Sequence, residues 1–149
     1  MRSVLQRVSH ATVSVDGEVV GRIDRGLVAL VAIVTGDGPT DIEYTASKFG
    51  DLRLFADAQG RMNQSVVDVG GAILLVSEFT LAGDVRRGRR PAFDAAAPPE
   101  VARLAYDALI ARVRATGLVV ETGRFQAHME LALVNDGPVT ILLDSRRAF

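Results

Sequence analysis

The fold is decided by the stretch Leu131-Ala132-Leu133-Val134-Asn135-Asp136-Gly137-Pro138-Val139-Thr140-Ile141-Leu142-Leu143. Its apolar halves, 131–134 and 139–143, have the composition of strands, and Gly137-Pro138 stands between them. Proline removes a hydrogen-bond donor from a sheet and is therefore confined to edges, bulges and turns. An X-Pro bond is also where a cis peptide costs least, about 0.5–1 kcal/mol. The residues alone leave two possibilities open, a hairpin turn or a rigid cis peptide that orients its carbonyls unusually.

A second segment places polar side chains at the end of a buried strand. The run Ala-Ile-Leu-Leu-Val at 72–76 is apolar and predicts a fully buried strand. Ser77, Glu78, Phe79 and Thr80 follow it directly. We therefore expect two hydroxyl groups and a carboxyl group at the rim of the sheet. The plainer alternative is a set of strand-end residues that bond the local backbone.

The rest of the chain alternates short strands with two helices. Asp16-Gly17 is a strong hairpin signal. The pair Thr40 and Glu43 predicts a capping box that starts a helix ending near Gly50. Further strands are expected at 4–8, 11–15, 18–23, 27–34, 52–55, 118–121 and 127–134, a loop at 83–97, and a second helix from 98–99 to about 117 with the apolar stripe Val101, Leu104, Ala105, Ala108, Leu109 and Val113. Runs of strands with few helices predict an α+β fold with a mostly antiparallel sheet in a single domain, 1–149.

Composition excludes several classes of function. The chain has 149 residues, with 17 basic and 18 acidic side chains and a net charge of -1. That balance argues against binding nucleic acid through bulk positive charge. The absence of cysteine excludes disulfides and thiolate sites, and no spacing of His or carboxylate residues predicts a metal or cofactor site. No segment predicts a signal peptide or a membrane span, so a cytoplasmic protein is expected.

The residues do not favour a hydrolase built on a catalytic triad. Ser77, Thr80 and Thr140 are possible nucleophiles, but each needs a base within hydrogen-bond reach. The chain has two histidines, His10 and His128, and neither stands at a telling offset from an aspartate. Catalysis by positioned backbone N–H groups, which stabilise an oxyanion, is the alternative.

Several motifs in one order resemble the D-aminoacyl-tRNA deacylase family. Members of that family have Ser-Gln-Phe-Thr-Leu where this chain has Ser-Glu-Phe-Thr-Leu at 77–81, and Asn-Asp-Gly-Pro-Val-Thr at 135–140. The likeness also takes in Gln6-Arg7-Val8, 88–91 and 122–125. It implies hydrolysis of the ester in D-aminoacyl-tRNA, and in glycyl-tRNA, without a cofactor. It also implies a sheet rolled toward a barrel with two helices on one side.

The resemblance assigns roles to particular residues. It implies a catalytic rim at Ser77, Glu78, Phe79 and Thr80. It implies a Gly-cisPro at 137–138 that enters the active site of the other subunit of a homodimer and rejects L side chains. It also implies that Arg7 braces that motif, with Val139 and Thr140 in support. Phe125 with Met129 would suit a pocket for the terminal adenine, and the alternative is that Phe125 packs in the core. Arg89 and Arg90, in the arginine-dense stretch 86–90, would contact phosphates of the acceptor stem, and the alternative is a solvated loop.

Glu78 departs from the family's glutamine. An ionised carboxylate only accepts hydrogen bonds, whereas glutamine also donates. An unpaired anion beside a developing oxyanion would oppose catalysis, so we expect Glu78 to point away or to pair with an arginine, such as Arg7 or one at 86–90. Two other functions stay open. One is a relative that deacylates a small L-aminoacyl-tRNA and holds its Gly-Pro in trans, and the other is a non-catalytic tRNA-binding module inactivated by Glu78.

Overall fold

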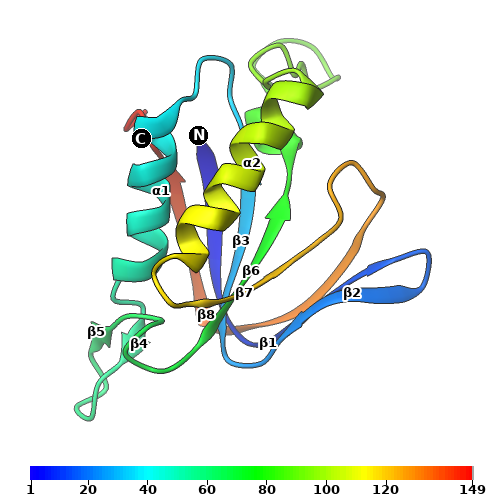
Figure 1. Ribbon diagram of the computed structural model, residues 1–149. Coiled ribbons are helices and arrows are strands. Elements are labelled where there is room, and N and C mark those ends of the chain that lie inside the picture. The colour runs from blue at the N-terminus through cyan, green and yellow to red at the C-terminus, as the bar shows by residue number, and fades with distance from the viewer. Residues whose placement is uncertain (149) are drawn as a thin grey trace.

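A computed structural model describes residues 1–148 of the chain. Two α-helices lie side by side over one face of a curved sheet (Figure 1). The elements in order are β1 Arg2–Val15, β2 Glu18–Ile23, β3 Gly26–Ala32, α1 Pro39–Asp51, β4 Phe55–Ala56, β5 Met62–Gln64, β6 Ala72–Ser77, the 3-10 helix η1 Phe79–Ala82, α2 Pro99–Arg114, β7 Val119–Thr122 and β8 Glu130–Asp144.

The main sheet has the order β2-β1-β3-β6-β7, and β8 pairs with the other edge of β1. β1 is antiparallel to β2, β3 and β8, whereas β3–β6 and β6–β7 are parallel pairs. The parallel pairs follow from the two helices, because each crossover between parallel strands carries one helix. The two edges of this sheet, β2 and β7, curl toward each other, and the backbone at Gly21 in β2 lies close to the Thr122 carbonyl in β7. The expected α+β class, with two helices on a sheet rolled toward a barrel, is confirmed, and the sheet is mixed.

β8 does not end at Gly137-Pro138. Gln6 pairs with Thr140 and Val8 pairs with Asn135, so two steps along β1 face five steps along β8. Three extra residues therefore form a wide bulge within one long strand. β1 is likewise one strand through Ser9 and His10, where two separate strands were expected.

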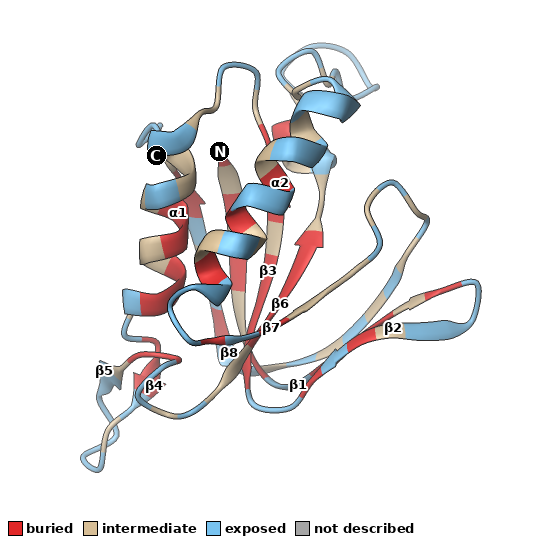
Figure 2. Cartoon of the chain, in the orientation of Figure 1, coloured by how far each residue is buried: buried red, intermediate tan, exposed pale blue. Residues whose placement is uncertain are grey.

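The core lies between the helices and the sheet, and burial follows that division (Figure 2). Leu5, Leu27, Ile73 and Leu75 of the sheet are fully buried. Phe49 packs against them from α1 and Leu109 from α2. The helices are also joined at the surface, where Arg112 donates to both carboxylate oxygens of Glu43 at 2.6 Å.

Three details of the expected elements were wrong. α1 begins at Pro39, so Gly38 precedes it and donates its N–H to the Asp41 carboxylate at 2.9 Å in place of the Thr40 and Glu43 pair. The strand expected at 52–55 is not formed at 52–54, and the short strand β4 begins at Phe55. The buried stripe of α2 is rotated, because Val101, Leu104 and Ala108 are exposed, while Ala102, Tyr106 and Ile110 join Ala105, Leu109 and Val113 on the side facing the core.

Candidate active site

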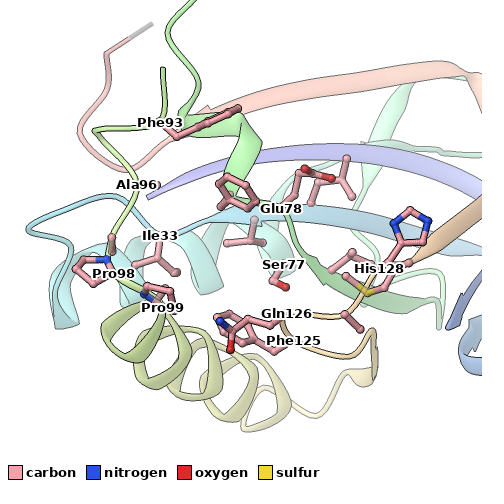
Figure 3. A pocket seen from close by; sticks show the side chains of 18 of the residues that line it. Ile33, Ser77, Glu78, Phe93, Ala96, Pro98, Pro99, Phe125, Gln126 and His128 are labelled. Carbon is pink, nitrogen blue, oxygen red and sulfur yellow. The ribbon is translucent and has the colours of Figure 1, made fainter. Parts of the chain in front are cut away.

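A cavity of about 750 Å³ opens where β6 ends. One wall is Ser77, Glu78 and Phe79, and another is the segment from Phe125 to Met129 that precedes β8. Pro98 and Pro99, at the start of α2, lie at one end, whereas His128 lies at the other end (Figure 3). The structure therefore brings together two of the motifs that the sequence singled out.

The Ser77–Thr80 turn is held by the sheet beside it. Ser77 pairs with Val31 at the end of β6, and the Glu78 N–H donates to the Val31 carbonyl at 2.8 Å. The Glu78 carbonyl accepts from Leu81 at 3.2 Å as the chain enters η1. Within residues 1–148 the N–H groups of Phe79 and Thr80 have no hydrogen-bond partner. Two backbone donors are therefore free beside the cavity.

The Glu78 carboxylate bonds a hydroxyl group and not an arginine. The Thr80 hydroxyl donates to Glu78 Oε1. Glu78 was expected to point away or to pair with an arginine, and the second arrangement is not found in the described chain, where Arg7 pairs with Asp136 and Arg86 pairs with Asp84. The side chain of Thr80 itself lies outside the lining of the cavity. Phe79 is 59% exposed, and its ring meets Phe93 edge-on at 5.1 Å.

Phe125 is held against α2 by two residues that the sequence did not single out. Its ring lies 5.9 Å from the ring of Tyr106, and the Arg103 guanidinium lies 5.5 Å from its centre. The Tyr106 hydroxyl donates to the Leu75 carbonyl at 2.8 Å, and burial raises the pKa of Tyr106. Arg103 and Tyr106 are three positions apart, which is the signal that would have placed them on one helix face. Met129 packs on Gly123, where a Cβ would lie 2.6 Å from its sulfur.

Gly137 and Pro138 lie outside the lining of this cavity. They are exposed on the bulge of β8, and the peptide bond between them is cis. Asn135 anchors the bulge, because its side chain accepts from the Val139 N–H and donates to the Thr140 hydroxyl, both at 3.0 Å.

Arg7 braces the same bulge from β1. Its Nε donates to the Asp136 carbonyl at 3.1 Å and pairs with the Asp136 carboxylate at 3.2 Å. Its Nη1 donates to the Leu54 carbonyl, and its guanidinium lies 6.0 Å from the centre of the Phe55 ring. The side chain is only 14% exposed, so the charge is held in one orientation.

Comparison with known proteins decides the family. The family model described as D-Tyr-tRNA(Tyr) deacylase matches residues 4–144. The chain belongs to this family. Proteins named D-aminoacyl-tRNA deacylase from Koribacter versatilis and Desulfitobacterium hafniense are each 56% identical over all 149 residues, and the alignment covers the whole of both relatives.

Two solved structures have a similar fold. One, titled c-Myc DNA Unwinding Element Binding Protein, has a TM-score of 0.91 at 38% identity, over 97% of this chain and 98% of that one. Another, titled as a probable eukaryotic D-amino acid tRNA deacylase, has a TM-score of 0.82 over 95% of this chain and 97% of that one. Its identity is 20%, so it supports the fold alone.

The arginine-rich segment 86–90 of this deacylase family member follows η1 in the chain and lies outside the lining of the cavity. Arg86 donates to the Asp84 carboxylate at 2.6 Å, and this hydrogen bond lowers the pKa of Asp84. Arg89 and Arg90 are exposed. Within residues 1–148 no group of three His, Asp or Glu side chains is placed to hold a metal ion, and no helix is both long and apolar enough to span a membrane.

Proposed function

We propose that this chain hydrolyses the ester bond between a D-amino acid and tRNA, releasing both as a proofreading step of translation in the cytoplasm. The observation that carries the proposal is 56% identity, over the whole length, to proteins named D-aminoacyl-tRNA deacylase. The cavity supports it, because residues 77–79 of the turn and the segment with Phe125 and Met129 line one space. Its volume is within the range of sites that bind small molecules.

The proposed chemistry uses backbone and not a side-chain nucleophile. The free N–H groups of Phe79 and Thr80 stabilise the oxyanion that forms when water attacks the ester carbonyl. Each donor of this kind is worth on the order of 10²–10³ in kcat. The neighbouring ribose hydroxyl of the terminal adenosine assists the water. Neither His10 nor His128 is needed in this scheme.

The proposed contacts with tRNA divide between the cavity and its surroundings. Phe125 and Met129 offer the terminal adenine an apolar wall, and base stacking on an aromatic ring is worth about 1–3 kcal/mol. Arg89 and Arg90 are free of carboxylate partners in the described chain and are proposed to meet phosphates of the acceptor stem.

Selection by chirality is proposed to need a second copy of the chain. Gly137 and Pro138 are exposed and lie outside the cavity of their own chain, yet Arg7 and Asn135 hold them rigidly. In a homodimer the motif of one subunit would enter the cavity of the other. Its carbonyls would occupy the space that an L side chain requires, while glycine, which has no side chain, would enter.

The experiment compares D-tyrosyl-tRNA, L-tyrosyl-tRNA and glycyl-tRNA as substrates of the purified protein. We expect release of amino acid from the D-tyrosyl and glycyl esters and protection of the L-tyrosyl ester. Cleavage of both tyrosyl esters at similar rates would contradict steric exclusion, and binding of D-tyrosyl-tRNA without turnover would indicate a binding module. Sedimentation at micromolar concentration should give a dimer, and a monomer would refute the shared site.

A further inference from the structure

Strand β6 extends further than its neighbour β7. The last pair between the two strands is Leu75 with Thr122, and the Gly123 N–H then donates to the Leu75 carbonyl at 3.1 Å. β6 continues to Ser77, whereas the chain leaves the sheet after Gly123. Past that point, within residues 1–148, no strand pairs with this side of β6, although β3 still pairs with the other side.

Tyr106 of α2 takes the place of the missing strand. Its hydroxyl donates to the Leu75 carbonyl at 2.8 Å, so this carbonyl accepts from both Gly123 and Tyr106. The Ser77 N–H points to the same side, because N–H groups alternate along a strand and the Glu78 N–H donates to β3. Burial raises the pKa of Tyr106, and the backbone N–H of Ser77 acts in the opposite direction, as a donor beside the hydroxyl oxygen does.

A tyrosine hydroxyl can serve both backbone groups at once. It donates one hydrogen bond and accepts another, as a peptide unit does. Tyr106 is only 2% exposed, so water does not reach the hydroxyl to take over this role. A buried backbone group that loses its partner is costly. The hydroxyl therefore stands where the next residue of β7 would stand.

The Ser77–Thr80 turn leaves the sheet directly from this point. On the β3 side, the Glu78 N–H fixes it through the Val31 carbonyl at 2.8 Å. On the other side, the hydroxyl of Tyr106 holds the end of β6. The free N–H groups of Phe79 and Thr80 follow within three residues of Ser77. Catalysis by fixed donors is sensitive to their position, and a displacement of about 1 Å can cost on the order of 10²-fold in rate.

We propose that the Tyr106 hydroxyl positions the Ser77–Thr80 turn by replacing the missing residue of β7, so that hydrolysis depends on a side chain outside the lining of the cavity. The inference rests on the proposed function, because the turn carries the donors for the oxyanion. Tyr106 acts through the backbone and touches neither the ester nor the attacking water. Without the hydroxyl, the Leu75 carbonyl keeps one donor, the Ser77 N–H loses its acceptor, and the turn is held from the β3 side alone.

The test is Tyr106→Phe, which removes one oxygen atom and keeps the ring against Phe125. With D-tyrosyl-tRNA as substrate, kcat should fall by about tenfold to a hundredfold, the order expected for displaced oxyanion donors. KM should change by less than about threefold, because every residue that lines the cavity is kept. An unchanged kcat would overturn the inference, as would a change confined to KM.

Two control variants separate positioning from general loss of stability. Tyr44→Phe removes the hydroxyl of the chain's other tyrosine, which is on α1 and outside the lining of the cavity. Val113→Ala opens a cavity under α2 and destabilises the fold through core packing alone. Both should keep kcat within about twofold of the parent, and urea unfolding ranks the stability of all the variants. A loss of kcat in Val113→Ala equal to that in Tyr106→Phe would overturn the inference.

Backbone amide exchange, followed by NMR, tests the contact without any substrate. In Tyr106→Phe the Ser77 amide should exchange at least about tenfold faster than in the parent, because its acceptor is gone. The Glu78 amide, which donates to the Val31 carbonyl on the other side, should keep its rate within about twofold. If the parent cleaves no tRNA ester, the proposed function fails, yet this selective change still supports the role of the hydroxyl at the end of β6. Equal exchange of Ser77 in the parent and the variant refutes the inference whatever the activity.

Discussion

Removal of Arg7 should loosen the β8 bulge without unfolding the sheet around it. The guanidinium donates to the carbonyls of Leu54 and Asp136 and pairs with the Asp136 carboxylate. In Arg7→Ala all three contacts are lost, and the Leu54 carbonyl, in a residue only 6% exposed, keeps no charged donor. The bulge would then be held from one side alone, by Asn135.

The magnitude follows from the two carbonyl contacts. A hydrogen bond that involves a charged group contributes about 1.5–3 kcal/mol to stability. The ion pair adds little, because Asp136 is 54% exposed and exposed pairs are worth about 0–1 kcal/mol. Allowing for water that reaches the opened site, Arg7→Ala should lower the free energy of unfolding by about 2–4 kcal/mol. The stability of Arg7→Lys should fall between those of the parent and Arg7→Ala, because an ammonium keeps the charge but cannot reproduce the planar set of donors of the guanidinium.

Urea unfolding at a fixed protein concentration measures this loss, and Arg22→Ala is the control. Arg22 is exposed on β2 and forms no ion pair within the described residues, so its removal should change stability by no more than about 0.5 kcal/mol. The ratio of D- to L-tyrosyl-tRNA cleavage should also drop in Arg7→Ala. A variant whose stability and ratio both match the parent would show that Arg7 does not hold the bulge.

Two further predictions concern backbone strain and pH. Gly137 has φ of 128°, and a Cβ there would lie 2.8 Å from the Val139 side chain. Gly137→Ala should therefore lower the free energy of unfolding in urea by about 1–3 kcal/mol, and by more than Gly17→Ala, because no atom lies close to Gly17. Equal losses in the two variants would contradict the steric argument. The hydrogen bond from Arg112 lowers the pKa of Glu43. The folded state therefore favours the ionised carboxylate, and the difference in stability between the parent and Glu43→Gln should be present at pH 7 and disappear as pH falls below about 4.3 and protonates Glu43. A difference that persists at pH 2 would refute this linkage.

Local patterns predicted the strands better than the helix faces. The hairpin at Asp16-Gly17 and the apolar run of β6 were visible because a turn signal or an unbroken apolar run has one interpretation. α2 was harder, since alanine, valine and leucine occur around much of its circumference. The true phase is set by Tyr106, which buries its ring and donates to the Leu75 carbonyl. The Leu75 carbonyl on β6 therefore decides which face of α2 is buried, and the periodicity of the helix sequence alone does not reveal this contact.

The site was predictable only where a motif carried it. Residues 77–79 and the segment that begins at Phe125 line one cavity, although they are far apart in the sequence and nothing local predicts that they meet. The arginine expected for Glu78 illustrates the limit. The expectation rested on the cost of an unpaired charge in a tight site, but Arg7 pairs with Asp136 and Arg86 pairs with Asp84, and Glu78 has no ion pair in the described chain. Such pairings depend on tertiary geometry that no local pattern encodes.

The register of the sheet explains why one chain is proposed not to complete its own site. Ser77 pairs with Val31, which pairs with Ser3, so the Ser77–Thr80 turn lies level with the start of β1. The bulge is braced at Arg7, four residues further along that strand. Strands β8, β1, β3 and β6 stand in that order, so the two motifs are three strand spacings apart, roughly 14 Å, and roughly 13 Å along the strand direction. A rigid sheet cannot close that gap, whereas a two-fold related copy can present its bulge to the cavity and receive the same in return.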